Sequence, residues 1–189
     1  MVESSGTAVI LHSSSKGSDF LTNDHVCEGA KKAGSFIVMN GKHYLVTSIK
    51  PSRKADLCLM HVNEDIRIDT EIAPRAPEFG DDILTAGHPL AMPLVVQRGL
   101  LGETFDSGDS ILSPEFVTIM SIIAQPGQSG SGVFNSEGMI VGIVEAINPG
   151  MKGGVMGFAL AVPWAQIQRF VTKEAPKLPW IGVPRAPRT

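Results

Sequence analysis

Residues 126–143 read PGQSGSGVFNSEGMIVGI, and this stretch says most about the fold and function of the 189-residue chain. Ser129 stands among glycines, directly before an apolar run. Glycine allows backbone conformations that other residues avoid, so a substrate can come close to such a turn. The N–H groups of Gly127 and Ser129 would then point at one spot, where they could stabilise an oxyanion. The pattern indicates a nucleophile loop; a Gly-Ser loop without a function is the alternative.

Two segments upstream supply the groups that a serine nucleophile needs. LTNDHV (residues 21–26) carries His25 at a predicted strand end, and ADLCL (residues 55–59) carries Asp56 at a predicted strand start. A serine hydroxyl is a poor nucleophile at neutral pH unless a base accepts its proton, and the base needs an acceptor that fixes its tautomer. The order His25, Asp56, Ser129 therefore indicates nucleophilic catalysis by a triad.

The chain resembles the trypsin-like serine proteases, and within them the HtrA/Deg type, from Gly6 to about Val171. The similar segments, in chain order, are GTAVILHSSSKGSDFLTNDHV, ADLCLMHV, FGDDILTAGHPL, VVQRGLLG, PGQSGSGVFNSEGMIVGI and GFALAVP. Agreement in order and spacing across all of these segments is far more specific than any one motif. The resemblance implies an all-β, chymotrypsin-like fold of two six-stranded antiparallel β-barrels with a C-terminal helix and the active site between the barrels.

The resemblance also implies a role for each site residue. Ser129 would be the nucleophile, His25 the general base and acid, and Asp56 the carboxylate that orients His25. Gly127 and Ser129 would form the oxyanion hole. The implied reaction is peptide hydrolysis through an acyl-enzyme, with no metal and no cofactor.

The chain departs from the family's pattern at three places. Gln128 stands where the family usually has Asn or Asp, and Ser131-Gly132 replaces the more usual Gly-Pro or Gly-Ala. Glu145 stands where many relatives carry a small hydroxyl or amide side chain close to the triad aspartate. We expect Glu145 to face solvent on an alternating strand; pointing inward, its charge would raise the proton affinity of Asp56 or His25.

Substrate specificity depends, in this fold, on the residues just before the nucleophile loop and on the strand after it. Those residues are here Ile123 and Ala124, followed by Ala146, Ile147 and Asn148. No carboxylate stands at the pocket base, so a preference for Lys or Arg is not expected. We predict a small or medium aliphatic residue before the cleaved bond, as the resemblance also suggests.

The residue pattern itself is typical of an all-β protein, because short apolar runs alternate with turn residues. We expect strands at residues 7–11, 35–39, 43–49, 57–62, 82–87, 94–101, 116–122, 139–147 and 157–162. Asn40-Gly41 lies between two of them and fits a tight two-residue turn. The apolar spacing after Pro163 predicts one helix.

We divide the chain into five parts. They are an N-terminal barrel (1–73) with His25 and Asp56, a linker (74–80), a C-terminal barrel (81–162) with Ser129, a helix (163–173) and a Pro-rich tail (174–189). The spacing of prolines predicts that the tail is extended and poorly ordered.

Composition excludes several classes of protein. With 43% hydrophobic residues the chain is globular rather than disordered. A net charge of −3 and a pI near 5.9 argue against an electrostatic grip on nucleic acid or an anionic membrane. No apolar run reaches the roughly 20 residues that span a bilayer. We expect a soluble protein, cytoplasmic if Met1 is the natural start, and periplasmic or organellar if a signal was removed.

Cys27 and Cys58 each lie two residues beyond a triad member, so they could be spatial neighbours. Two buried free thiols, the default in a reducing compartment, are the favoured interpretation, and a disulfide beside the active site is the alternative. The remaining histidines show no ligand spacing with each other or with the cysteines, so no metal site is expected.

Two functions from different classes remain open. The first is a serine endopeptidase that cleaves unfolded or flexible protein segments. The second is a catalytically silent or resting module that binds a peptide strand in the same cleft. Residues 180–183 (WIGV) resemble the start of a PDZ domain, so the chain is either a minimal protease or a piece of a longer one. We expect a protein or peptide partner and a monomer or small homo-oligomer, with a trimer in doubt.

Overall fold

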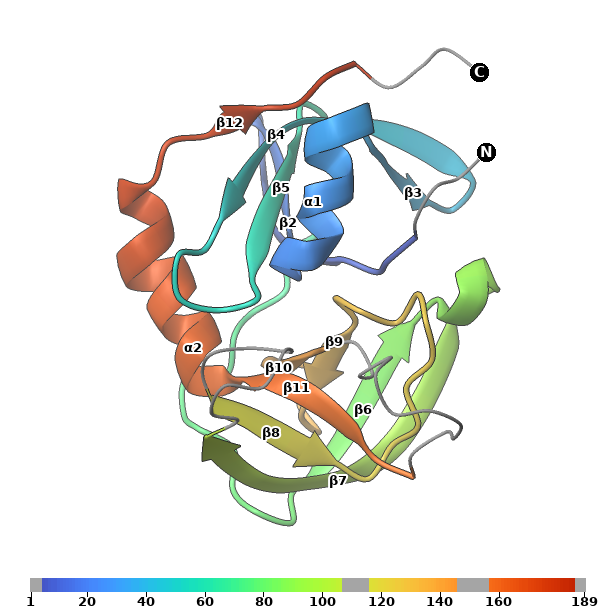
Figure 1. The fold of residues 1–189 in the computed structure, drawn as a ribbon, viewed down its shortest axis with the longest axis vertical. Helices are drawn as coiled ribbons and strands as arrows, with labels where there is room; N and C mark the ends of the chain where they lie inside the picture. The colour runs from blue at the N-terminus through green and yellow to red at the C-terminus, as the bar shows by residue number, and fades with distance from the viewer. Residues whose placement is uncertain (1–4, 107–115, 146–156, 186–189) are drawn as a thin grey trace.

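Two antiparallel β-structures stack on each other in the computed structural model, which describes residues 5–106, 116–145 and 157–185 (Figure 1). The upper one is a six-stranded sheet in the order β1-β2-β5-β4-β12, with β3 paired to β4. Its strands are β1 (Val9–Ser14), β2 (Gly17–Thr22), β3 (Phe36–Met39), β4 (Lys42–Pro51), β5 (Cys58–Val62) and β12 (Ile181–Gly182). This sheet therefore takes its last strand from the far end of the chain.

The lower structure is a closed six-stranded barrel in the order β10-β11-β8-β7-β6-β9. Its strands are β6 (Asp82–Gly87), β7 (Val95–Asp106), β8 (Phe116–Met120), β9 (Gly132–Phe134), β10 (Ile140–Val144) and β11 (Ala159–Pro163). Every predicted strand overlaps an observed one, and the all-β, chymotrypsin-like fold with a C-terminal helix is confirmed. Of the two predicted six-stranded barrels, the lower one is closed, whereas the upper six strands form a sheet that does not close among the described residues.

The turn at Asn40-Gly41 also forms as predicted. Met39 pairs with Lys42, so only these two residues join β3 to β4. Asn40 and Gly41 have φ angles of 51° and 74°, as the tight turn requires.

A helix that the sequence analysis did not predict, α1 (Asp24–Ala33), follows β2 directly. Its sequence, DHVCEGAKKA, has apolar residues at helical spacing (Val26, Cys27 and Ala30), but they are few and mostly small, and Gly29 interrupts them. Packing supports the helix, because Cys27 and Ala30 are buried against the upper sheet. The helix ends at Gly34, whose φ of 77° suits glycine, and two lysines occupy its last turn.

The C-terminal helix begins after Pro163 as predicted. α2 (Trp164–Arg169) is followed by a wider π-helical turn over Phe170–Glu174 and a short 3-10 turn over Ala175–Lys177. The described part of the tail, up to residue 185, is extended and packs on the upper sheet. Ile181 pairs with Ile49 of β4, and the Trp180 ring contacts the His61 ring at a tilt of 53°. Proline spacing missed this edge strand, because a two-residue strand leaves no periodic pattern.

One of the three apolar clusters holds the two halves together. It combines Leu21 and Leu57 from the upper sheet, Ile140 and Ile143 from the barrel, and Phe170 from the C-terminal helical segment, all almost fully buried. In Figure 1 this segment runs along the side of both halves. The relative position of the halves is thus set by a shared core, and the residues at their junction are held in register.

Candidate active site

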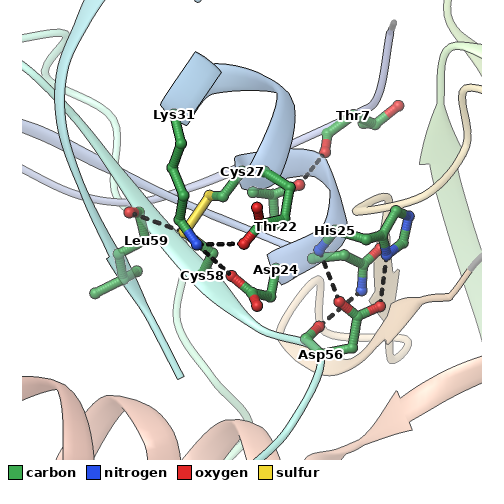
Figure 2. The surroundings of a disulfide bond; sticks show 11 residues. Thr7, Thr22, Asp24, His25, Cys27, Lys31, Asp56, Cys58 and Leu59 are labelled. Carbon is green, nitrogen blue, oxygen red and sulfur yellow. Dashed lines mark hydrogen bonds and ion pairs between the residues drawn. A yellow bond between two sulfur atoms is a disulfide. The ribbon is translucent and has the colours of Figure 1, made fainter. Parts of the chain in front are cut away.

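His25 and Asp56 form a close pair on the underside of the upper sheet. His25 lies in the first turn of α1, and Asp56 lies in the loop between β4 and β5. The Asp56 carboxylate accepts two hydrogen bonds from His25, at 3.0 Å from the backbone N–H and 2.7 Å from ring Nδ1 (Figure 2). Because a carboxylate only accepts, Nδ1 carries the proton and Nε2 is left with a lone pair. This is the tautomer that a general base needs.

A hydrogen bond from the buried Asn23 helps to hold the His25–Asp56 pair in place. Asn23, which is fully buried at the start of α1, donates its side-chain N–H to the Asp56 carbonyl at 3.0 Å. The Asp56 side chain is 12% exposed and the His25 side chain 44%. Asp56 is therefore shielded while the His25 ring can still reach a substrate.

A disulfide joins the two elements that carry the pair. Cys27 of α1 is bonded to Cys58 at the start of β5, with both residues fully buried (Figure 2). The prediction of two free thiols is therefore wrong, and the alternative holds. The signal was the common offset of two residues from His25 and Asp56: since those two residues touch, their neighbours along the chain also come close.

Thr7, which sequence analysis did not single out, connects the pair to the predicted nucleophile loop (residues 125–131). Its N–H donates to the Ser129 carbonyl at 2.8 Å, and its hydroxyl donates to the Gly127 carbonyl at 2.9 Å. Its own carbonyl accepts the Thr22 hydroxyl at 2.7 Å, two residues before the helix of His25 (Figure 2). No pattern in the sequence marks Thr7, because its role depends on contacts 15 and 120 residues away.

The nucleophile loop connects the barrel's β8 side to β9 and carries Ser129, which is 8% exposed. Gly127 and Gly130 have φ angles of 93° and 86°, which other residues rarely adopt. Gln128 is buried, and its side-chain oxygen accepts the Gln125 N–H at 2.7 Å. The Gln128 side chain thus bridges back to the start of the loop, and the backbone of Gly127 and Gly130 keeps its positive φ angles.

The backbone amides of this loop divide into two sets. The N–H groups of Gln128, Gly130 and Ser131 donate to backbone carbonyls. Those of Gly127 and Ser129 have no acceptor among the residues that the structure describes. These are the two amides that sequence analysis assigned to an oxyanion hole.

Ser129 lies at the junction of the two halves, near the His25 helix. Gly6 lies between them so tightly that an added Cβ would be 2.9 Å from Val26 and 3.4 Å from the Ser129 carbonyl. Within residues 5–106, 116–145 and 157–185, no hydrogen bond links the Ser129 hydroxyl to His25. In substrate-free enzymes this contact is commonly long and shortens when substrate binds.

Glu145, expected at the surface, is buried with 1% of its area exposed. The residue follows the last residue of β10, and its N–H donates to the Leu160 carbonyl of β11 at 2.8 Å. Burial, and secondarily the negative charge of Asp56, raise the pKa of Glu145 to about 8. Strand alternation failed here because the end of β10 enters the junction of the halves, where both strand faces are covered: all of β10 is buried.

The predicted specificity residues are only partly described. Ile123 is 45% exposed, whereas Ala124 is 2% exposed and packs in the barrel core. Ala146, Ile147 and Asn148 lie outside the described residues. In the described part of the chain, no group of acidic, histidine or cysteine side chains could hold a metal ion. No helix there is long and apolar enough to cross a membrane.

Comparison with known proteins identifies the family. Residues 6–143 match the model of the trypsin-like peptidase domain. The chain therefore belongs to the trypsin-like peptidases.

Curated relatives include probable periplasmic serine endoproteases of the DegP-like type. That of Hahella chejuensis is 28% identical over 85% of this chain, and that of Marinomonas sp. is 29% identical over 76%. The chain spans about a third of the length of these relatives, 33% and 30% respectively.

Solved structures show the same fold. The HtrA-type protease AlgW with a decapeptide has a TM-score of 0.71 at 23% identity, covering 89% of this chain and 52% of that one. An inactive form of Rv3671c from M. tuberculosis has a TM-score of 0.73 at 16% identity, covering 92% and 83%. This chain thus has the same chymotrypsin-like fold as proteins with which it shares less than a quarter of its residues.

Proposed function

We propose that this domain is the catalytic part of a serine endopeptidase, with Ser129 as nucleophile, His25 as general base and acid, and Asp56 as the orienting carboxylate. The observation that carries the proposal is the His25–Asp56 pair, in which two hydrogen bonds fix both the position and the tautomer of the ring. Thr7 holds this side of the site against the loop of Ser129.

The chemistry follows from these positions. Ser129 Oγ bonds to the substrate carbonyl carbon while its proton passes to Nε2 of His25. The resulting oxyanion accepts hydrogen bonds from the N–H groups of Gly127 and Ser129. His25 then returns the proton to the leaving amine as the C–N bond breaks, and water hydrolyses the acyl-enzyme by the same steps. The mechanism needs neither a metal nor a cofactor.

Hydrolysis of an unstructured polypeptide tests this mechanism. We expect Ser129→Ala to lower kcat/KM by about three to six orders of magnitude, because the nucleophile is lost. Ser136→Ala is the matched control, since Ser136 is exposed in the turn before β10. Equal turnover by the two variants would exclude Ser129 as the nucleophile.

A resting module that binds peptide without cutting it is the second candidate. The observation that favours it is the missing hydrogen bond between Ser129 and His25 in the described residues. Binding of an unstructured peptide by isothermal calorimetry without any turnover, by the wild-type chain, would support the resting module over the endopeptidase.

The proposed substrate is an unfolded or flexible segment with a small or medium aliphatic residue before the cleaved bond. Extended segments can pair with a strand edge beside the nucleophile loop. Ala124, with Ala146, Ile147 and Asn148, is proposed to frame the side-chain pocket, and all four are uncharged. Cleavage of a peptide library after Val, Ala, Ile or Leu is the expected result, and cleavage after Arg or Lys would contradict it.

A further inference from the structure

Glu145 is a buried acid that the proposed mechanism does not use. Its side chain is 1% exposed, and neither carboxyl oxygen has a hydrogen-bond partner in the described residues. Buried polar atoms are nearly always paired, so an unpaired carboxyl beside an active site needs a physical explanation. An ionised carboxylate in this position would be costly, whereas a neutral carboxyl costs much less.

The surroundings of Glu145 favour the neutral form. The pKa of Glu145 is raised to about 8, mainly by burial and secondarily by the negative charge of Asp56. Asp56, from the loop before β5, is hydrogen-bonded to His25 of α1. The pKa of Asp24 in the same helix is raised mainly by burial, and the negative charge of Asp56 also contributes. On the side of β11, the contact of Glu145 is its backbone hydrogen bond to the Leu160 carbonyl. No described residue forms an ion pair with Glu145, so nothing offsets a second anion beside Asp56.

The backbone next to Glu145 is bound to the nucleophile loop. The Val144 N–H donates to the Ser131 carbonyl at 2.8 Å, and the Val144 carbonyl accepts the Gly130 N–H at 2.9 Å. These two residues follow Ser129 directly. A displacement of Glu145 is therefore passed through Val144 to the loop that positions Ser129.

Ionisation of Glu145 would act on the site in two ways. An unpaired, buried Glu145 carboxylate would be repelled by the Asp56 carboxylate, so it must move toward water or draw water in. Movement disturbs the Val144 contacts with the nucleophile loop. In addition, a second anion beside Asp56 favours the protonated form of His25, which cannot act as a base.

We propose that Glu145 is a positioning residue whose neutral carboxyl keeps the Asp56 side of the site and the nucleophile loop in the reactive arrangement, so that its ionisation switches the peptidase off. The inference rests on the proposed function of His25, Asp56 and Ser129. It assigns an alkaline limit of activity to one side chain.

The experiment compares kcat/KM for a peptide substrate between pH 6 and pH 10 in three forms of the chain. Wild type should lose at least tenfold in activity between pH 7.5 and pH 9.5. Glu145→Gln, which keeps the shape and cannot ionise, should lose less than twofold over the same range. Glu137→Gln, at an exposed position, is the control and should follow wild type.

An equal alkaline loss in wild type and Glu145→Gln would overturn the proposal, as would a folded Glu145→Gln that is inactive at every pH. Absence of turnover in wild type at every pH would instead contradict the proposed function. Infrared spectra of wild type add a readout that needs no variant to fold. A carboxylic acid band present at pH 7 that disappears by pH 10 supports the proposal, and no band at pH 7 overturns it.

Discussion

Thr7 shows how a single side chain can assemble this site. Its hydroxyl donates to Gly127 and accepts from the His88 N–H at 3.1 Å, so one oxygen ties the nucleophile loop to the segment after β6. The residue is 8% exposed, so water replaces neither bond easily. Loss of a buried hydrogen bond typically costs about 1 to 3 kcal/mol when a partner stays unsatisfied.

Thr7→Val keeps the shape of the side chain and removes both bonds. We expect the free energy of unfolding to fall by about 1 to 3 kcal/mol and kcat/KM to fall about tenfold or more, because the loop loses its anchor. Thr172→Val is the control, since Thr172 is exposed and donates its hydroxyl to the Gln168 carbonyl within the C-terminal helical segment. Urea denaturation and peptide hydrolysis measure both quantities, and equal activities in the two variants would contradict the role of Thr7.

Gly130 is a second position where the residue type is dictated by contacts. Its φ is 86°, and an added Cβ would lie 2.0 Å from the Thr7 carbonyl and 2.3 Å from the Thr22 hydroxyl. Gly41 has a similar φ of 74° with no atom within 4 Å of such a Cβ. Comparing alanine substitutions at Gly41 and Gly130 therefore separates the cost of a positive φ, which both share, from the cost of a steric clash, which only Gly130 has.

Gly41→Ala should therefore cost only about 1 kcal/mol of unfolding free energy, from the positive φ alone. Gly130→Ala should cost more than this and also abolish most of the activity, because the backbone around Ser129 must shift. Thermal denaturation of both variants provides the comparison; similar melting temperatures and activities would refute the packing of Gly130 against Thr7 and Thr22.

At the scale of elements, the sequence predicts the strands well and α1 poorly. The β3–β4 hairpin could be predicted because Asn40-Gly41 is a local signal, and β6 because its alternation is local. α1 was missed because its helical spacing involves few and mostly small apolar residues, whose burial and disulfide depend on the packed sheet. The His25–Asp56 contact was expected from the motifs, whereas Thr7, Asn23 and the burial of Glu145 depend on tertiary contacts.

The disulfide should stabilise the link between α1 and β5. Cys27 and Cys58 are 31 residues apart, and closing a loop of this size stabilises a protein by about 2 to 4 kcal/mol. We expect reductant to lower the free energy of unfolding of wild type, measured by urea denaturation, by an amount of this order, and to have no effect on Cys27→Ala/Cys58→Ala. A wild-type value that does not respond, in a chain shown by mass spectrometry to be reduced, would show that the bond adds no stability.

The whole molecule is held together by the cluster that joins both halves and the C-terminal helical segment. The proposed triad is split across the halves, with His25 and Asp56 in the upper half and Ser129 in the lower one. The sequence indicated both halves and the order of their motifs, because each half has its own strand pattern. It did not indicate that Glu145, which directly follows β10, is buried at the junction of the halves.

The pH dependence of stability reports on that junction. An acid whose pKa rises from 4.5 to about 8 on folding binds more protons in the folded than in the unfolded state between these values. Its contribution to stability is therefore greatest at low pH and declines as the pH rises, by about 1.4 kcal/mol per pH unit. The decline ends above about pH 8.

Urea denaturation of Ser129→Ala with and without Glu145→Gln isolates this contribution, since all other titrating groups are shared. We expect the difference in unfolding free energy between the two proteins to change steadily from about pH 5 to pH 8 and then to level off. A difference that is constant with pH would mean that Glu145 ionises normally in the folded chain.

Covalent labelling determines whether His25, Asp56 and Ser129 form a working catalytic triad. The purified chain is treated with a fluorophosphonate, and the modified residue is mapped by mass spectrometry, with Ser129→Ala and Ser136→Ala in parallel. We expect labelling of Ser129 in wild type and in Ser136→Ala, and none in Ser129→Ala, because only an assembled triad activates the Ser129 hydroxyl. A folded wild-type chain that takes no label at Ser129 would contradict the proposed triad.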